Sequence, residues 1–199
     1  MLETALGLDY AMTAPHRSAA KVGADVMEAG GSAIEAMVAA AAAIAVVYPH
    51  MNGIGGDGFW IIRRPGERPV GISACGGAAG LATPEWYAGH GIADALPSRG
   101  ALAALTVPGT IGGWQAALDL VPAEKRVPLS DLLAPAVKLA REGIAVSRNQ
   151  AETTAEKLDG LRDVPGFADI YLDGGQAPRA GARLVQAALG ETLAHLGEA

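Results

Sequence analysis

The sequence has very little cysteine and no run of basic residues. Cys75 is the single cysteine among 199 residues, which excludes an internal disulfide and any metal cluster built on several cysteines. Acidic residues outnumber basic ones by 21 to 15, for a net charge of −6. Nucleic acid and anionic membranes are therefore not expected as partners. No His, Asp or Glu spacing matches a metal site, and neither a metal nor another cofactor is expected.

The first ten residues also lack the pattern of a secretion signal, in which a basic region precedes an apolar core. The expectation is a cytoplasmic protein, provided that Met1 is the natural start. Half of the residues are hydrophobic and 18% are charged, which is typical of a globular protein and not of a disordered one. The chain is long enough for one domain with a sizeable core, and neither a repeat nor a linker divides it.

The most apolar stretch is predicted to be a central helix over residues 33–47. Ser32 and Glu35 stand three residues apart, as the partners of a capping box do, and Pro49 predicts the helix end. A helix that is apolar on every side is buried in protein or in a membrane. This one is short of the roughly 20 residues that a bilayer requires. We therefore expect other elements to pack closely on several of its sides.

Residues 53–58 read GIGGDG and match the G-x-G-x-x-G pattern of dinucleotide-binding proteins. That pattern requires a strand before the glycines and a helix after them, so that the pyrophosphate meets a helix N-terminus. Here a helix precedes the turn and a predicted strand follows it, which argues against a nucleotide site. The glycines are interpreted instead as positions of positive φ or close backbone approach. His50 and Asn52 flank the turn and are candidates either to orient a substrate or to cap the preceding helix.

The rest of the pattern predicts a β-hairpin among helices, and hence a layered α/β or α+β domain. Phe59–Arg63 and Val70–Cys75 are the two predicted strands of the hairpin. Short strands are also expected at residues 10–13 and 105–107. Helices are expected at residues 17–28, 84–88 (capped by Thr83), 111–120, 132–141 (capped by Ser130), 147–161 (a capping box of Ser147 and Gln150) and 191–199.

Several motifs follow one another along the chain. Residues 29–36 read AGGSAIEA and residues 49–59 read PHMNGIGGDGF. They are followed by TVPGT at 106–110, LLAPAVKLAREG at 132–143 and YLDG at 171–174. Each motif alone is common, but the ordered set resembles the N-terminal part of the γ-glutamyltranspeptidase family of N-terminal-nucleophile hydrolases. The resemblance extends from about residue 9 to the end of the chain, and family members continue well beyond this point.

This resemblance implies that residues 1–199 are a single domain, the N-terminal portion of a large subunit. The implied fold is α+β, part of an αββα sandwich whose sheet core is completed by a second chain. The implied nucleophile is a threonine that becomes the N-terminus of a small subunit after self-cleavage and whose amine serves as the general base. No threonine of this chain stands in such a context. We therefore assign no catalytic residue here and expect the chain to contribute substrate binding and scaffold.

The family pattern also implies one substrate-binding group, an arginine in a sequence like R-E-x-A-P that grips the α-carboxylate of the γ-glutamyl donor. In this chain Cys75 stands at the arginine position and Gly76 at the glutamate position. Losing such a charge-assisted hydrogen bond weakens substrate binding by about ten- to a hundredfold. The predicted substrate-binding residues are therefore Ser73, Cys75 and Gly76, with Arg99 as the first candidate for a replacement cation.

Alternatives remain for each of these positions. Cys75 is interpreted as lining a pocket for an acyl group without an amino-acid head, as inert packing, or as a thiol nucleophile, which requires a histidine in reach. No histidine is tied to it by a sequence pattern. Arg99 is otherwise an exposed loop charge, and Arg63 and Arg64 are further candidates for the cation.

The resulting prediction is an enzyme, a γ-glutamyltranspeptidase-like (glutathione hydrolase-like) amide hydrolase or acyltransferase that acts through the N-terminal threonine of a separate small subunit. One alternative is hydrolysis of a non-glutamyl amide, of the oxamate or cephalosporin type, because Cys75 replaces the arginine. Another is a non-catalytic scaffold fragment.

Overall fold

The computed structural model describes residues 6–198. The expectations for the first five residues and for Ala199, which ends the predicted C-terminal helix, lie outside the described residues. The chain forms two compact units, each built from separate segments. We call them the helical unit (residues 6–53, 114–151 and 179–198) and the hairpin unit (residues 54–113 and 152–178).

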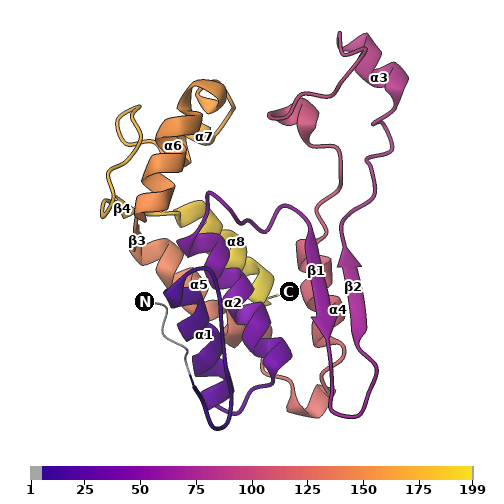
Figure 1. Cartoon of the computed structure of the whole chain (residues 1–199), viewed down its shortest axis with the longest axis vertical. Coiled ribbons are helices and arrows are strands. Elements are labelled where there is room, and N and C mark those ends of the chain that lie inside the picture. The colour runs from indigo at the N-terminus through magenta and orange to yellow at the C-terminus, as the bar shows by residue number, and fades with distance from the viewer. Residues whose placement is uncertain (1–5, 199) are drawn as a thin grey trace. The chain divides into compact units, whose positions relative to one another are not determined.

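The helical unit is built around α2 (Ala33–Val47), as the alanine-rich sequence predicts. Helix α2 packs against α1 (Arg17–Glu28) and α5 (Leu129–Glu142), and α5 packs against α8 (Ala187–Glu198) (Figure 1). Most of the α2 side chains are buried. Because most of the buried side chains are alanine, the neighbouring backbones can approach closely. Each alanine removes only a small apolar area from water, but together these areas stabilise the packing of the whole helix.

The capping box at the start of α2 also connects two distant segments. The Glu35 carboxylate accepts hydrogen bonds from the Ser32 amide at 2.7 Å, the Ser32 hydroxyl at 2.7 Å and the Val127 amide at 2.6 Å. Burial alone would raise the pKa of Glu35, but these hydrogen bonds and the charge of Arg126 outweigh it and lower the pKa. The carboxylate is therefore stabilised in its charged form although its residue is 1% exposed.

The hairpin unit contains the two predicted strands, β1 (Gly58–Ile62) and β2 (Val70–Ala74), paired antiparallel with Trp60 opposite Ile72. The Trp60 side of β1 is turned toward Gly113, where a Cβ atom would lie 3.3 Å from the Trp60 Nε1. On the opposite side Phe59 is 71% exposed and Ile61 is 86% exposed. The hairpin therefore has one covered face and one apolar face open to solvent.

The remaining elements are short or connect the two units along the chain. Helix α4 (Thr110–Leu118) begins in the hairpin unit and α6 (Arg148–Leu161) begins in the helical unit. The others are α3 (Pro84–Gly89), α7 (Phe167–Tyr171), β3 (Ile144–Ala145) paired antiparallel with β4 (Arg183–Leu184), and single 3₁₀ turns at Ala101–Ala103 and Ala123–Lys125.

The α+β class predicted from the sequence is confirmed, whereas several local predictions are wrong. Residues 10–13 form no strand, and residues 105–107 contribute only one bridge, Ala78 to Thr106. Ser130 does not cap α5, which begins at Leu129 after Pro128. Ser147 does cap the Gln150 amide at 3.0 Å, but within residues 6–198 the buried Gln150 side chain has no hydrogen-bond partner, so the capping box is half formed.

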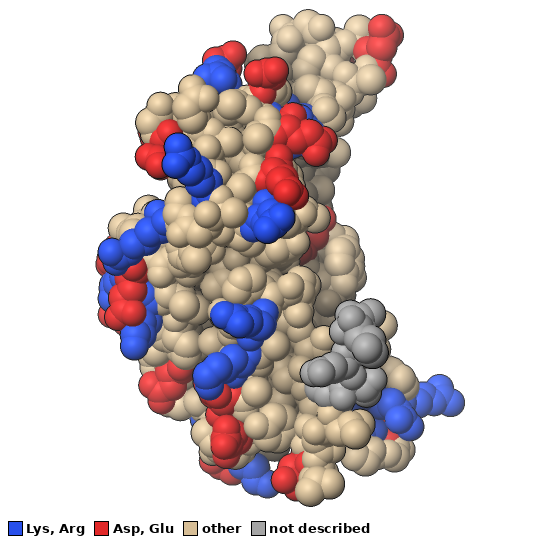
Figure 2. Space-filling view, turned by 60° about the vertical axis from the view of Figure 1, so that its left-hand side comes forward, with Lys and Arg blue, Asp and Glu red and all other residues tan. Residues whose placement is uncertain are grey.

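Within the described part of the chain, no helix combines the length and the apolar character needed to cross a bilayer. Acidic and basic side chains are interspersed over the face that Figure 2 shows, and neither sign gathers in one place.

Candidate functional site

Three of the predicted site residues lie together where β2 ends. The Ser73 hydroxyl and the Cys75 thiol are 3.2 Å apart, within hydrogen-bond distance for a sulfur partner. Ser73 stands opposite Phe59 in the hairpin register, and the Cys75 thiol is exposed. The end of β2 therefore presents small, uncharged polar groups beside an apolar strand.

The next residue, Gly76, is held against a second segment of the hairpin unit. A Cβ atom at Gly76 would overlap the Val107 carbonyl oxygen, so no side chain fits there without a backbone shift. The Val107 amide donates a hydrogen bond to the Gly77 carbonyl at 2.9 Å, which fixes the approach. Position 76 is therefore closed by backbone, and glycine is required by the space available.

Arg99 is placed beside α6. A Cβ atom at Gly160 would lie 2.9 Å from the Arg99 Nη1. The hydrogen bond and charge of Lys157 hold the pKa of Glu156 below its usual value, and the charge of Arg99 adds to this effect. Within residues 6–198, Arg99 makes no hydrogen bond with Ser73 or Cys75. The structure thus brings Ser73, Cys75 and Gly76 together and leaves the role of Arg99 as a replacement cation a prediction.

The glycine turn at residues 53–58 does not have the positive φ angles or the close backbone approach predicted for it from the sequence. None of its four glycines has positive φ, and at Gly53, Gly55 and Gly56 a Cβ atom would meet nothing within 4 Å. The turn is nevertheless fixed, because the Gly56 carbonyl accepts hydrogen bonds from the residues that begin α4. Gly109 and Thr110, which donate these hydrogen bonds, belong to the TVPGT motif, but the sequence alone does not predict that this motif contacts the glycine turn.

His50 and Asn52, which flank the turn on its N-terminal side, make structural contacts in the helical unit. The His50 Nε2 lies 2.7 Å from the Asn149 Oδ1, and the Tyr48 hydroxyl donates to the same oxygen at 2.8 Å. The Asn52 amide donates to the Tyr48 carbonyl at 3.5 Å. These contacts close the end of α2 and favour the capping interpretation over substrate orientation. Asn149 was not identified from the sequence.

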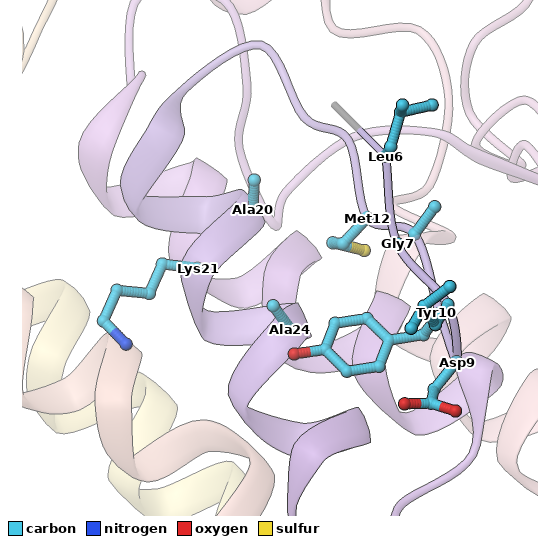
Figure 3. A pocket seen from close by; sticks show the side chains of 10 residues that line it. Leu6, Gly7, Asp9, Tyr10, Met12, Ala20, Lys21 and Ala24 are labelled. Atoms are coloured by element: carbon cyan, nitrogen blue, oxygen red, sulfur yellow. The ribbon is translucent and has the colours of Figure 1, made fainter. Parts of the chain in front are cut away.

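The hollow drawn in Figure 3 is separate from these residues in the chain. It lies in the helical unit, between residues 6–12 and α1. Figure 3 shows the Tyr10 ring lying toward Ala24 while the Lys21 side chain extends away; its ammonium pairs with Asp25 at 2.7 Å. None of the predicted substrate-binding residues lines this hollow. Among residues 6–198, no group of three or more His, Cys, Asp and Glu side chains is arranged to hold a metal ion.

The chain is similar to known proteins both in sequence and in structure. The family model for γ-glutamyltranspeptidase matches residues 19–199, and the chain belongs to this family. In sequence, it is 52% identical over 184 residues to an oxamate amidohydrolase proenzyme of Klebsiella pneumoniae, covering 90% of this chain and 34% of that protein. It is 36% identical over 199 residues to a glutathione hydrolase-like proenzyme of Bacillus subtilis, covering 100% of this chain and 37% of that protein.

The three-dimensional likeness agrees with the sequence. The γ-glutamyltranspeptidase of Helicobacter pylori superposes with a TM-score of 0.85 at 32% identity, covering 100% of this chain and 56% of that chain. This agreement places the helices and the hairpin within a partial N-terminal-nucleophile hydrolase fold. The chain spans about a third of the length of the two relatives named above.

Proposed function

We propose that the protein containing this chain is a self-cleaving amide hydrolase of the γ-glutamyltranspeptidase family that acts on a short, non-glutamyl amide. The observation that carries the proposal is the end of β2, where the Cys75 thiol lies 3.2 Å from the Ser73 hydroxyl and no side chain fits at Gly76. The resemblance to the family pattern implies that Cys75 stands in place of its carboxylate-binding arginine. The sequence identity is higher to an oxamate amidohydrolase than to a glutathione hydrolase-like protein, which also supports a short, non-glutamyl substrate.

The chemistry of the two acyl groups explains why a neutral residue suits the shorter one. In a γ-glutamyl amide, three carbon atoms separate the scissile carbonyl from the α-carboxylate. In oxamate the carboxylate is bonded directly to the scissile carbonyl. The site that meets an oxamate carboxylate must therefore lie nearer the nucleophile than the arginine of the family pattern does, and Cys75 can fill the space that the longer acyl group would occupy.

The proposed reaction divides between this chain and a second one. The threonine Oγ of the small subunit would attack the amide carbon, its proton passing to the leaving nitrogen, and water would then release the acid. This chain would supply the wall of the acyl pocket. The second subunit would cover the hairpin face that carries Phe59 and Ile61, whose exposure supports such a partner.

The test uses the complete gene product. Ammonia release from oxamate and p-nitroaniline release from L-γ-glutamyl-p-nitroanilide are measured side by side, and we expect kcat/KM to favour oxamate by at least about tenfold. A preference for the γ-glutamyl substrate would overturn the short-amide proposal and revive Arg99 as the replacement cation. Hydrolysis of neither would favour a scaffold.

Two variants at one position sharpen this test. Cys75→Arg should raise γ-glutamyl hydrolysis and lower oxamate hydrolysis. Cys75→Ser keeps a small polar side chain and should retain oxamate hydrolysis within about threefold. Complete loss in Cys75→Ser would instead favour the thiol nucleophile.

A further inference from the structure

The Gly56 carbonyl is the most heavily hydrogen-bonded point of the glycine turn. It accepts from the Thr110 hydroxyl at 2.7 Å, the Thr110 amide at 2.9 Å and the Gly109 amide at 3.0 Å. A carbonyl oxygen has two lone pairs, so with three donors neither lone pair is left without a partner. Thr110 is also the first residue of α4 and is 8% exposed. The contact therefore satisfies amides at the helix N-terminus that would otherwise lack partners.

The residues just before Thr110 are packed against the end of β2. A Cβ atom at Gly109 would overlap the Ala74 carbonyl oxygen and lie 3.2 Å from the Gly76 amide. A Cβ atom at Gly76 would likewise overlap the Val107 carbonyl oxygen. We call residues 107–110 the wedge segment, because it is packed at one end against β2 beside Cys75 and is hydrogen-bonded at the other end to the glycine turn.

We propose that Thr110 is a specificity-determining residue that holds the wedge segment against Gly76, next to Cys75 in the chain, and thereby limits the pocket to short acyl groups. This proposal rests on the proposed function, because it assigns the acyl pocket to the end of β2. The Thr110 hydroxyl is the one side-chain donor among the three. Removing it leaves two amide bonds to Gly56, so α4 keeps its start while the wedge segment is held less firmly.

The experiment compares Thr110→Val with Thr110→Ser in the complete gene product. Valine keeps the shape of threonine and loses the hydroxyl, whereas serine keeps the hydroxyl. The substrates are oxamate and succinamate, which differ by two methylene groups between carboxylate and amide. In Thr110→Val we expect KM for oxamate to rise about tenfold, because a tenfold change corresponds to the free energy of about one buried hydrogen bond. The value of kcat should change by less than about twofold. The oxamate-to-succinamate ratio of kcat/KM should fall about tenfold, and Thr110→Ser should restore it.

The matched control is Thr192→Val. Thr192 lies on α8 in the helical unit, where its hydroxyl donates to the Ala188 carbonyl at 3.0 Å. The same substitution there removes the same kind of bond, and the substrate ratio should be unchanged. A structural role of Thr110 alone would lower the amount of active enzyme and hence the apparent kcat, and would leave KM and the substrate ratio as in the wild type. That result would overturn the proposal.

A second measurement decides the proposal if the wild-type protein hydrolyses neither substrate, an outcome that would refute the proposed function. The rate of Cys75 alkylation by iodoacetamide is followed by mass spectrometry of the peptide that contains it. A wedge segment held by Thr110 predicts a rate at least about threefold higher in Thr110→Val than in the wild type or in Thr192→Val. Equal rates in all three proteins would contradict the positioning of Cys75 by Thr110.

Discussion

The helical unit and the hairpin unit bury their apolar residues to very different extents. Among residues 6–198, the buried hydrophobic side chains lie in the helical unit, with Tyr87 as the single exception. In the hairpin unit, Phe59, Ile61 and Leu81 are each more than two thirds exposed. The helical unit thus has a core of its own, whereas the apolar face of the hairpin has the character of a surface that another segment covers.

The largest expected effect comes from removing a core side chain of the helical unit. Leu132→Ala deletes a residue that is 1% exposed and should lower the free energy of unfolding by about 2–5 kcal/mol. Ile61→Ala, on the open face of the hairpin, should change it by less than about 0.5 kcal/mol when no partner covers that face. Urea unfolding followed by circular dichroism measures both. Equal losses would contradict the contrast between the two units.

The buried carboxylate at the start of α2 gives the next effect. Glu35→Ala leaves the Ser32 and Val127 amides without their acceptor and should lower the free energy of unfolding by about 2–3 kcal/mol. Glu35→Gln retains an acceptor oxygen and should lose about half as much. If alanine and glutamine variants were equally stable, the hydrogen bonds would not explain the burial of this residue.

Two glycines, Gly109 just before α4 and Gly112 within it, test the close packing of the hairpin unit. Gly109→Ala would force a Cβ atom into the Ala74 carbonyl and should destabilise the protein by about 1–3 kcal/mol. At Gly112 a Cβ atom would meet nothing within 4 Å, so Gly112→Ala should stabilise α4 by up to about 1 kcal/mol through helix propensity. Thermal unfolding of the two variants should therefore move in opposite directions. A neutral Gly109→Ala would show that the wedge segment can yield.

The smallest effect is the pH dependence contributed by Glu35. Its folded pKa lies below the ordinary value of 4.5, so the folded state binds this proton less readily than the unfolded state does. The stabilisation is present above pH 4.5 and is lost as the pH falls through the folded pKa. Unfolding measured between pH 6 and pH 3 should therefore show a steeper loss of stability below pH 4.5 in the wild type than in Glu35→Gln. Parallel curves would contradict this assignment.

The local pattern of the sequence predicts the elements of both units well, because their signals are short in range. Helices α1 and α2 have the predicted bounds, and the hairpin forms as predicted from β-branched and aromatic residues that flank a Pro- and Gly-rich loop. The strands β3 and β4 were not predicted. Each has two residues, which is too short for an alternating pattern to be seen.

The candidate site is only partly predictable for a different reason. Position in the family pattern predicts Cys75 and Gly76 as site residues, but it carries no information about what approaches them. The contacts of Val107 with Gly76 and of Thr110 with Gly56 join residues far apart in the chain. Such contacts are set by tertiary packing and leave no periodic signal. The positive φ expected in the glycine turn is absent, and at Gly53, Gly55 and Gly56 a Cβ atom would meet nothing within 4 Å.

The measurement that tests the account most directly is the intact mass of the complete gene product after purification. If the hairpin face is covered by a subunit released by self-cleavage, two fragments will appear, and the smaller will begin with threonine. A single uncleaved species would contradict the self-cleaving hydrolase and leave this chain as part of a scaffold.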